Sequence, residues 1–198
     1  MSPQRRVEDI LEAITPYQPN ADVALIQRAY MYSAKVHAGQ LRKSGEPYLI
    51  HPLEVAYILT QLKMDDASVA TGLLHDTVED TLATLADLKG LFGDEIARLV
   101  DGVTKLSKIY FDTDEHKQAE NFRKMLVSMA SDIRVIVIKM ADRLHNMQTL
   151  GHLPEPKQQR IAQETLDIYA PLANRLGVNW LKTQLEDLAF KFLHPAEY

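Results

Sequence analysis

Four ionisable residues crowd the end of one otherwise apolar segment, residues 69–81, which reads VATGLLHDTVEDT. They are His75, Asp76, Glu79 and Asp80. On a continuous helix, side chains four positions apart are neighbours, so the imidazole and the three carboxylates would share one arc. Carboxylates at the C-terminal end of a helix oppose its macrodipole, and a bound cation would remove this conflict. The alternative is a solvated acidic helix end that binds nothing.

A second histidine, His51, stands at the predicted start of another helix. It lies in YLIHP (residues 48–52), and the proline after it is favoured in the first turn of a helix. A histidine at this place could be a metal ligand. It could instead be a core or capping residue whose ring is satisfied by neighbouring groups.

Asp142 lies in a long segment, residues 133–150, that reads IRVIVIKMADRLHNMQTL. Its apolar residues recur at spacings of three and four and cover much of a helix circumference, which predicts a buried helix. A carboxylate in such a helix needs a partner, because an unpaired charge is costly to remove from water. A metal ion is one candidate. The alternative is a surface ion pair with Arg143 or Lys139.

The side chains that could form a metal cage from three separate helices are His51, His75, Asp76 and Asp142. Two imidazoles and two carboxylates suit manganese, iron or zinc better than magnesium or calcium. The chain has no cysteine, which excludes thiolate sites, disulfides and cysteine nucleophiles. Glu79 and Asp80 would lie just outside this shell. There they could hold and deprotonate a metal-bound water, whose pKa can fall to about 7.

Helical periodicity dominates the segments that must position these residues, and strand alternation is nowhere sustained. The pattern predicts an all-α fold of about eight to ten helices joined by short connections. The apolar stripes that indicate helices run over Val7–Ile14, Val23–Val36, His51–Leu62, Ala67–Thr77, Asp94–Leu106, Glu115–Ala130, Ile133–Leu150, Gln158–Leu176 and Asn179–Phe190. Two longer polar loops are expected, at Gly39–Leu49 and Ser107–Asp114.

The composition is that of a folded globular protein, with 46% hydrophobic and 25% charged residues in a chain of 198. No apolar run reaches the roughly 20 residues of a membrane span, and the N-terminus is charged, so we expect a cytoplasmic protein. The net charge of -5 argues against a broad nucleic-acid footprint. An anionic ligand would need a local basic patch, and Arg42-Lys43 supplies one shortly before His51, unless it is merely an exposed loop pair.

Six segments spread over nearly the whole chain carry a resemblance to a known family. They are RKSGEPYLIHP (42–52), LLHDTVEDT (73–81), LVDGVTKL (99–106), QAENFRKM (118–125), KMADRLHNM (139–147) and IYAPLANRLG (168–177). In these segments the chain resembles the HD superfamily and, within it, the hydrolase domain of RelA/SpoT proteins, which degrade the alarmones ppGpp and pppGpp. The resemblance implies an HD-domain helical bundle. It also implies hydrolysis of the 3'-pyrophosphate, giving GDP or GTP and pyrophosphate, with manganese(II) as the usual metal.

The resemblance also assigns roles to particular residues. The four cage residues match the family's metal ligands, and Glu79 and Asp80 match its catalytic acidic pair. Arg42 would stack on the guanine base. The other implied nucleotide contacts are Lys43 and Ser44 beside the base, and Asn146 and Thr149 on the ribose side of the pocket.

Long RelA/SpoT proteins continue into a synthetase domain and then into regulatory domains. The resemblance therefore divides the chain into a hydrolase domain, residues 1–178, and a C-terminal helix, residues 179–198, like the connector to a synthetase domain. The expected partners are the guanine nucleotide substrate and, if this sequence is an excised fragment, the synthetase and regulatory domains of a longer parent chain. The alternative is a naturally small alarmone hydrolase. We expect no synthetase activity from these residues.

Two other interpretations stay open at this point. The chain could be a non-catalytic regulatory HD module, as in relatives whose hydrolase domain has decayed, or an HD phosphohydrolase acting on another nucleotide such as NADPH. The intact metal and acidic residues favour catalysis. The segment Lys105–His116 is expected to be a mobile joint with a gating role. The histidines outside the motifs are assigned to the surface or to packing, and these are His37, His116, His145, His152 and His194.

Overall fold

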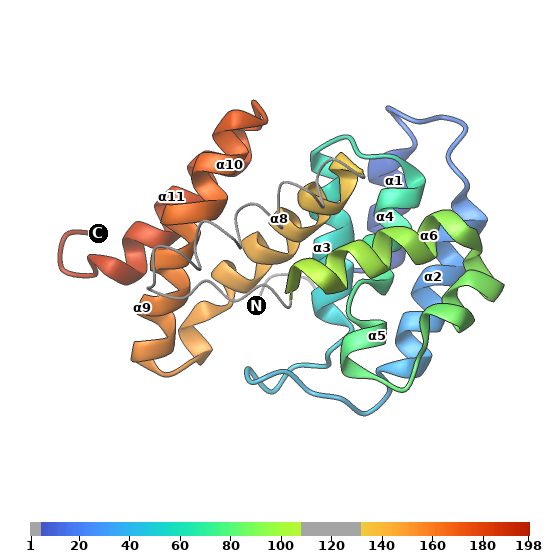
Figure 1. Cartoon of the computed structure of the whole chain (residues 1–198), viewed down its shortest axis with the longest axis horizontal. Coiled ribbons are helices and arrows are strands. Elements are labelled where there is room, and N and C mark those ends of the chain that lie inside the picture. Colours follow the sequence, from blue (N-terminus) through green and yellow to red (C-terminus); the bar gives the residue numbers. More distant parts are fainter. Residues whose placement is uncertain (1–4, 108–131) are drawn as a thin grey trace. The chain divides into compact units, whose positions relative to one another are not determined.

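The computed structural model describes residues 5–107 and 132–198, and regular structure in these ranges is entirely helical (Figure 1). The only pairing of extended backbone in this part of the chain is an isolated bridge between Leu41 and Pro47. The elements are α1 (Val7–Ile14), α2 (Val23–Val36), α3 (Ile50–Gln61), α4 (Asp66–Leu74), α5 (Thr77–Asp80), α6 (Leu85–Ser107), α8 (Ile133–Gln148), η1 (Leu150–His152), α9 (Glu155–Glu164), η2 (Thr165–Tyr169), α10 (Ala170–Arg175) and α11 (Asn179–Leu193). The predicted all-α fold class is confirmed.

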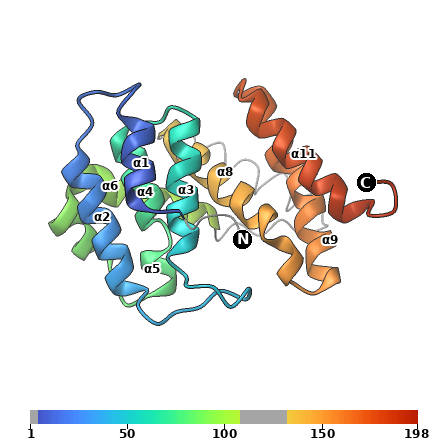
Figure 2. The same cartoon turned by 180° about the vertical axis from the view of Figure 1, so that it is seen from behind.

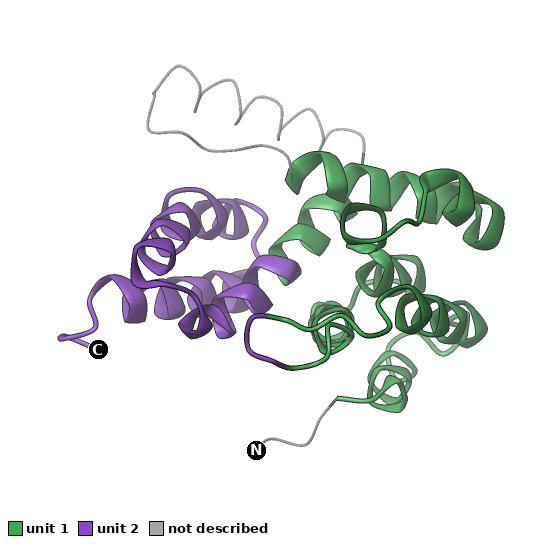
Figure 3. Ribbon diagram, turned by 90° about the horizontal axis from the view of Figure 1, so that it is seen from below, with its two compact units in different colours: residues 1–42, 46–141 green, residues 43–45, 142–198 purple. Residues whose placement is uncertain are grey.

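The chain forms two compact units, which are coloured separately in Figure 3. Unit 1 comprises Met1–Arg42 and Glu46–Ala141, and unit 2 comprises Lys43–Gly45 and Asp142–Tyr198. Helix α8 is continuous through the boundary, so its first turns belong to unit 1 and its last turns to unit 2. Among the described helices, none is both long enough and apolar enough to cross a membrane.

Helix α4 is the centre of unit 1 and packs against α2, α3 and α6, while α1 packs on α3. Figure 2 shows α1, α2 and α3 side by side, with α4 and α6 behind them. Every residue of α4 after the first is buried. A Cβ atom at Gly72 would lie 2.7 Å from Leu59 Cδ1 and 3.3 Å from Ala56 Cα, so the missing side chain permits the close approach of α3 and α4.

The first half of α8 is fixed within unit 1 by an ion-pair cluster. Arg134 Nη1 lies 2.9 Å from the carboxylate of Asp65, which caps α4, and 2.8 Å from that of Glu95 in α6. Near these ion pairs a Cβ atom at Gly102 would lie 2.8 Å from Val135 Cγ2. Helix α8 therefore starts in tight contact with α4 and α6.

In unit 2, α11 lays its buried face against α9, η2 and α10. The last turns of α8 are tied to α9 by Arg143, which forms an ion pair with Glu164 and stacks its guanidinium 4.2 Å from the centre of the Tyr169 ring. The predicted boundary between a domain at residues 1–178 and a connector at residues 179–198 is not tested by this division and stays a prediction.

Several predicted helices match the observed ones, and the differences have local causes. The ranges predicted for α1 and α2 agree at both ends, and Asp22 caps α2 by accepting a hydrogen bond from the Leu25 amide. The segment Gln158–Leu176, predicted as one helix, begins earlier, at Glu155, and is divided by the wide turn η2. The predicted helix Glu115–Ala130 lies outside the described residues, as does most of the expected joint at Lys105–His116.

The predicted helix Ala67–Thr77 is wrong at its C-terminal end. Helix α4 stops at Leu74, His75 and Asp76 form a turn, and α5 begins at Thr77. The backbone angles of both turn residues stay close to helical values, which is why apolar spacing alone does not reveal the interruption. The acidic residues of the segment therefore lie in the first turn of a new short helix and not at the end of a long one.

Gly93 breaks α6 with a φ of 89° and a ψ of 172°, a backbone conformation that only glycine adopts readily. The sequence predicted a helix start at Gly93-Asp94, and the chain does turn there. The sequence did not predict that the chain is already helical from Leu85. Helix α6 therefore consists of two helical segments that meet at Gly93.

Replacing Gly93 with alanine is expected to lower the free energy of unfolding by about 1–3 kcal/mol, because the side chain strains this backbone conformation. No atom lies within 4 Å of the added Cβ, so the loss reports backbone strain alone. The matched control is Gly90→Ala, which adds a methyl group at an equally open helical site without a positive φ. It should raise stability by up to about 1 kcal/mol. Urea denaturation measures the free energy of unfolding of both variants. Equal changes in the two variants would contradict backbone strain at Gly93 as the cause of the interruption in α6.

Candidate metal centre

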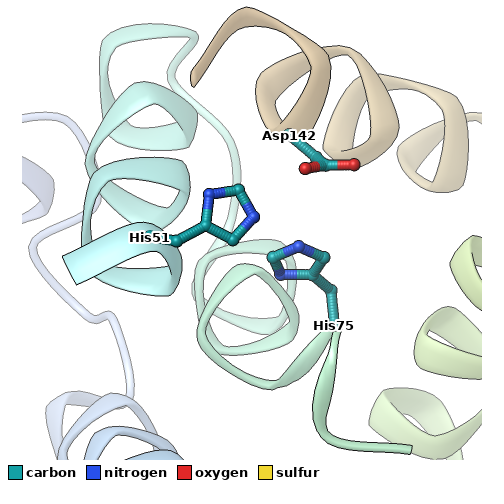
Figure 4. A group of neighbouring side chains, drawn as sticks. All are labelled: His51, His75 and Asp142. Atoms are coloured by element: carbon teal, nitrogen blue, oxygen red, sulfur yellow. The ribbon is translucent and has the colours of Figure 1, made fainter. Parts of the chain in front are cut away.

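Three buried side chains, His51, His75 and Asp142, each offer one ligand atom, and these atoms lie within 4.8 Å of one another (Figure 4). Their relative exposures are 2%, 1% and 4%. They form the candidate metal group found among residues 5–107 and 132–198. Asp142 lies in α8 and directly follows Ala141, the last α8 residue of unit 1.

His75 is held in one orientation by the end of α4. Its Nδ1 lies 2.8 Å from the carbonyl oxygen of Gly72, so Nδ1 carries the proton and donates it. In the neutral ring this leaves a lone pair on Nε2, the form in which histidine binds metals. His51 sits in the first turn of α3, where its backbone amide donates to the carbonyl of Tyr48 at 3.0 Å.

Asp76 faces both histidine rings. Its Oδ1 lies 3.0 Å from His75 Nε2 and its Oδ2 lies 3.4 Å from His51 Nε2. Burial raises the pKa of Asp76, but the two imidazoles outweigh burial and hold that pKa well below its usual range. The Asp76 carboxylate thus lies within 3.4 Å of two imidazole nitrogens, and imidazole nitrogens with carboxylate oxygens are a donor set that binds divalent cations. The group of His51, His75 and Asp142 could hold a metal ion, and Asp76, which is outside that group, stays a predicted fourth ligand.

Glu79 and Asp80 lie on α5, shortly after His75 and Asp76 in the chain, and the turn after Leu74 separates them from α4. Burial raises the pKa of Glu79, and the charges of Asp76 and Asp80 raise it further, while Ser107 and Lys139 act in the opposite direction. Lys139 Nζ donates to Ser107 Oγ at 2.8 Å. Glu79 thus interacts with residues of α6 and α8, namely Ser107 and Lys139.

Sequence reasoning missed Tyr48 as a site residue. Its hydroxyl lies 2.7 Å from Asp76 Oδ2 and 2.5 Å from Asp80 Oδ2, and burial together with these carboxylates raises its pKa. It also missed Ser107 and the contact of Lys139 with it. The position of Tyr48 three residues before His51 was a usable signal, since one helical turn links the two. Nothing in the spacing indicated the Lys139–Ser107 contact.

The residues predicted to contact a nucleotide fall into two groups. Arg42, Lys43 and Ser44 lie in the loop before α3, where the Arg42 amide donates to the Glu46 carbonyl at 2.8 Å and closes a tight turn. This turn requires Gly45, whose φ is 85°.

The second predicted group, Asn146 and Thr149, lies at the end of α8 in unit 2. Asn146 Nδ2 donates to Asp142 Oδ1 at 2.6 Å, and Thr149 Oγ1 donates to the His145 carbonyl at 3.1 Å. The structure thus gives Asn146 a contact that orients a candidate metal ligand, a role that the sequence did not predict.

Comparisons with known proteins show which family the chain belongs to. A family model described as HD domain matches residues 29–179. The chain is 65% identical over 188 residues to a GTP pyrophosphokinase of Myxococcus xanthus, an alignment that covers 93% of this chain and 25% of the relative. It is 50% identical over 191 residues to the bifunctional (p)ppGpp synthase/hydrolase SpoT of Escherichia coli K12, covering 96% of this chain and 27% of that protein.

The chain spans about a quarter of the length of these curated relatives. Among solved structures it is similar to a metazoan orthologue of SpoT described as hydrolysing ppGpp and playing a role in starvation responses. That comparison has a TM-score of 0.57 and 26% sequence identity, and it covers 85% of this chain and 94% of the other.

Saturating manganese(II) is expected to stabilise the native protein. At about 100 times the dissociation constant the gain is about 2.7 kcal/mol, or roughly 5–10 °C in melting temperature for a chain of this size. His51→Ala should abolish the shift between metal-free and metal-loaded protein, whereas His152→Ala, which removes an exposed histidine, should retain it. Thermal scans with and without a chelator measure the shift. An undiminished shift in His51→Ala would place the metal elsewhere.

Proposed function

The chain belongs to the HD domain family, in the group formed by the corresponding region of RelA/SpoT proteins, and from this premise we propose that it is a metal-dependent (p)ppGpp hydrolase. The proposed reaction removes the 3'-pyrophosphate and yields GDP or GTP and pyrophosphate. The observation that carries the proposal is the buried group of His51, His75 and Asp142 next to the acidic pair on α5. The similarity to an orthologue described as hydrolysing ppGpp supports the choice of substrate.

We propose that the metal ligands are His51, His75, Asp76 and Asp142, and that the metal is manganese(II). The donor set of imidazole nitrogens and carboxylate oxygens is compatible with this ion. When bound, a divalent ion supplies Lewis acidity, which lowers the pKa of a water molecule and offsets the negative charge of a pyrophosphate. Asn146 keeps the Asp142 carboxylate in place, and the Gly72 carbonyl does the same for the His75 ring.

In the proposed reaction, Glu79 is the proton acceptor. A water oxygen bonds to the phosphorus on the 3' side, the bond between that phosphorus and O3' breaks, and O3' departs as a hydroxyl. A carboxylate oxygen of Glu79 takes the proton that the water loses, and the same carboxyl can return a proton to O3'. Its raised pKa suits this exchange, because a general base works best when its pKa lies near the operating pH. Asp80 orients the water as a hydrogen-bond acceptor.

The substrate is strongly anionic and the chain has a net charge of -5, so binding depends on local basic groups. We propose that Arg42 stacks on the guanine base and that Lys43 and Ser44 contact the nucleotide beside it. Arginine suits this role because its planar guanidinium combines a stacking face with charge. Asn146 and Thr149 are proposed to contact the ribose.

Because the relatives are about four times longer, we propose that residues 179–198 connect the hydrolase domain, residues 1–178, to further domains, including a synthetase and regulatory domains. A cytoplasmic location, where the nucleotide would be met, likewise stays a prediction.

The direct test is release of pyrophosphate from ppGpp by the purified protein after loading with manganese(II). We expect turnover by the native protein, its loss in Asp76→Ala, and a decrease of about 10²–10⁴-fold in kcat for Glu79→Gln, which keeps the shape of the side chain but cannot accept the proton. The matched control is Glu186→Gln, a partly exposed glutamate of α11 that pairs with Lys182. A metal-loaded protein that leaves ppGpp intact would refute the proposal, and faster turnover of NADPH would reassign the substrate.

A further inference from the structure

The Tyr48 hydroxyl contacts two carboxylates of the site, those of Asp76 and Asp80. Its hydroxyl oxygen lies 2.7 Å from Oδ2 of Asp76, a proposed metal ligand, and 2.5 Å from Oδ2 of Asp80, a member of the acidic pair. A phenol carries one hydrogen, so this oxygen is shared between two groups that would otherwise repel each other. Asp80 is exposed and ends a one-turn helix, and such a short element does little to fix a side chain by itself.

Gln40 holds the backbone of the same aspartate. Its Nε2 donates to the Asp80 carbonyl at 3.1 Å, a contact between residues 40 positions apart in the chain. This contact fixes the orientation of the Gln40 side-chain amide. The atom facing the Asp80 carbonyl must be the donor Nε2, so the remaining atom is the acceptor Oε1. That Oε1 lies 2.8 Å from His37 Nδ1, so His37 carries a proton on Nδ1 and donates it to Gln40.

His37 contacts both of the other residues, Gln40 and Tyr48. Its ring stacks on the Tyr48 ring, with centroids 4.5 Å apart and an angle of 16° between the planes. The ring is 4% exposed, and its Nε2 is buried without a hydrogen-bond partner among the described residues. Leaving a polar atom in this state costs about 1–3 kcal/mol, and an apolar ring would pack there without that cost. The Nδ1 contact with Gln40 is the feature that requires histidine.

We propose that His37, Gln40 and Tyr48 form a clamp that positions Asp80, through both its carboxylate and its backbone carbonyl, at a fixed place beside the ligand Asp76. The clamp residues come from the end of α2 and from the loop that leads to α3, and they hold the end of α5. None of them is assigned a contact with substrate, so they are positioning residues. The proposal rests on the proposed function, in which Asp80 orients the attacking water. A misplacement of about 1 Å there can cost a factor of about 100 in rate.

Three variants test the clamp in the manganese-loaded protein. Tyr48→Phe removes the hydroxyl and keeps the stacked ring, Gln40→Leu removes the backbone contact, and His37→Phe keeps the stack but removes the donor. Each is expected to lower kcat for ppGpp by about 10–100-fold while KM changes less than about threefold, because the lost contacts act on the water-orienting group and not on substrate binding. Adding Gln40→Leu to Asp80→Asn should cause little further loss, since both act through the same aspartate.

Matched controls remove similar hydrogen bonds elsewhere. Tyr17→Phe deletes a hydroxyl that donates to the Met64 carbonyl at 2.7 Å, and Gln158→Leu deletes an amide that donates to the Leu153 carbonyl at 2.7 Å. Both should keep the native kcat. Circular dichroism and urea denaturation establish that every variant is folded before rates are compared.

Calorimetry of manganese(II) binding gives a reading that needs no substrate. Tyr48→Phe should raise the dissociation constant of the metal by about tenfold or more, because the hydroxyl also holds the ligand Asp76, whereas Gln40→Leu should leave it unchanged. If the native protein does not hydrolyse ppGpp, the proposed function fails, and the calorimetry still tests the contact of Tyr48 with Asp76 on which the clamp depends. Unchanged metal affinity in Tyr48→Phe, or native kcat in Tyr48→Phe and Gln40→Leu when the native protein is active, would overturn it.

Discussion

The carboxylate of Asp76 faces the ring nitrogens of two buried histidines, and much of unit 1 serves to maintain that contact. Burial alone would raise the pKa of Asp76, and the two imidazoles hold it down, so the charge of this carboxylate depends on the contact. Helix α4 ends at Leu74, and His75 and Asp76 lie together in the turn that follows it. Gly72 permits the close approach of α3, which carries His51.

Around this contact, the groups that handle protons are held from several directions. Lys139 and Ser107 lower the pKa of Glu79, while burial and the neighbouring carboxylates raise it. Tyr48 and Gln40 hold Asp80. The two acids of the pair are thus adjacent in sequence but differ in environment, since one is connected to α6 and α8 and the other to the loop before α3. This difference gives a physical reason for two separate roles.

Much of the fold follows from apolar spacing, and α1 and α2 agree with the sequence at both ends because each buries one clear stripe. The end of α4 was predicted wrongly because the turn at His75 keeps near-helical backbone angles. Among the candidate site residues, His51, His75 and Asp142 were proposed from their motifs, and the structure places their ligand atoms within 4.8 Å of one another. Gln40 and Ser107 could not, because their partners lie 40 and 32 positions away and only the packing of helices brings them together.

The central claim is that imidazole and carboxylate side chains of this chain hold a divalent metal. Pulsed electron paramagnetic resonance of the manganese(II)-loaded protein tests it most directly, because the electron spin of the ion detects coupled ¹⁴N nuclei of bound histidine. The account predicts coupling to the nitrogens of His51 and His75 that is reduced in His51→Ala and again in His75→Ala. A spectrum without nitrogen coupling, or one that neither substitution changes, would contradict it.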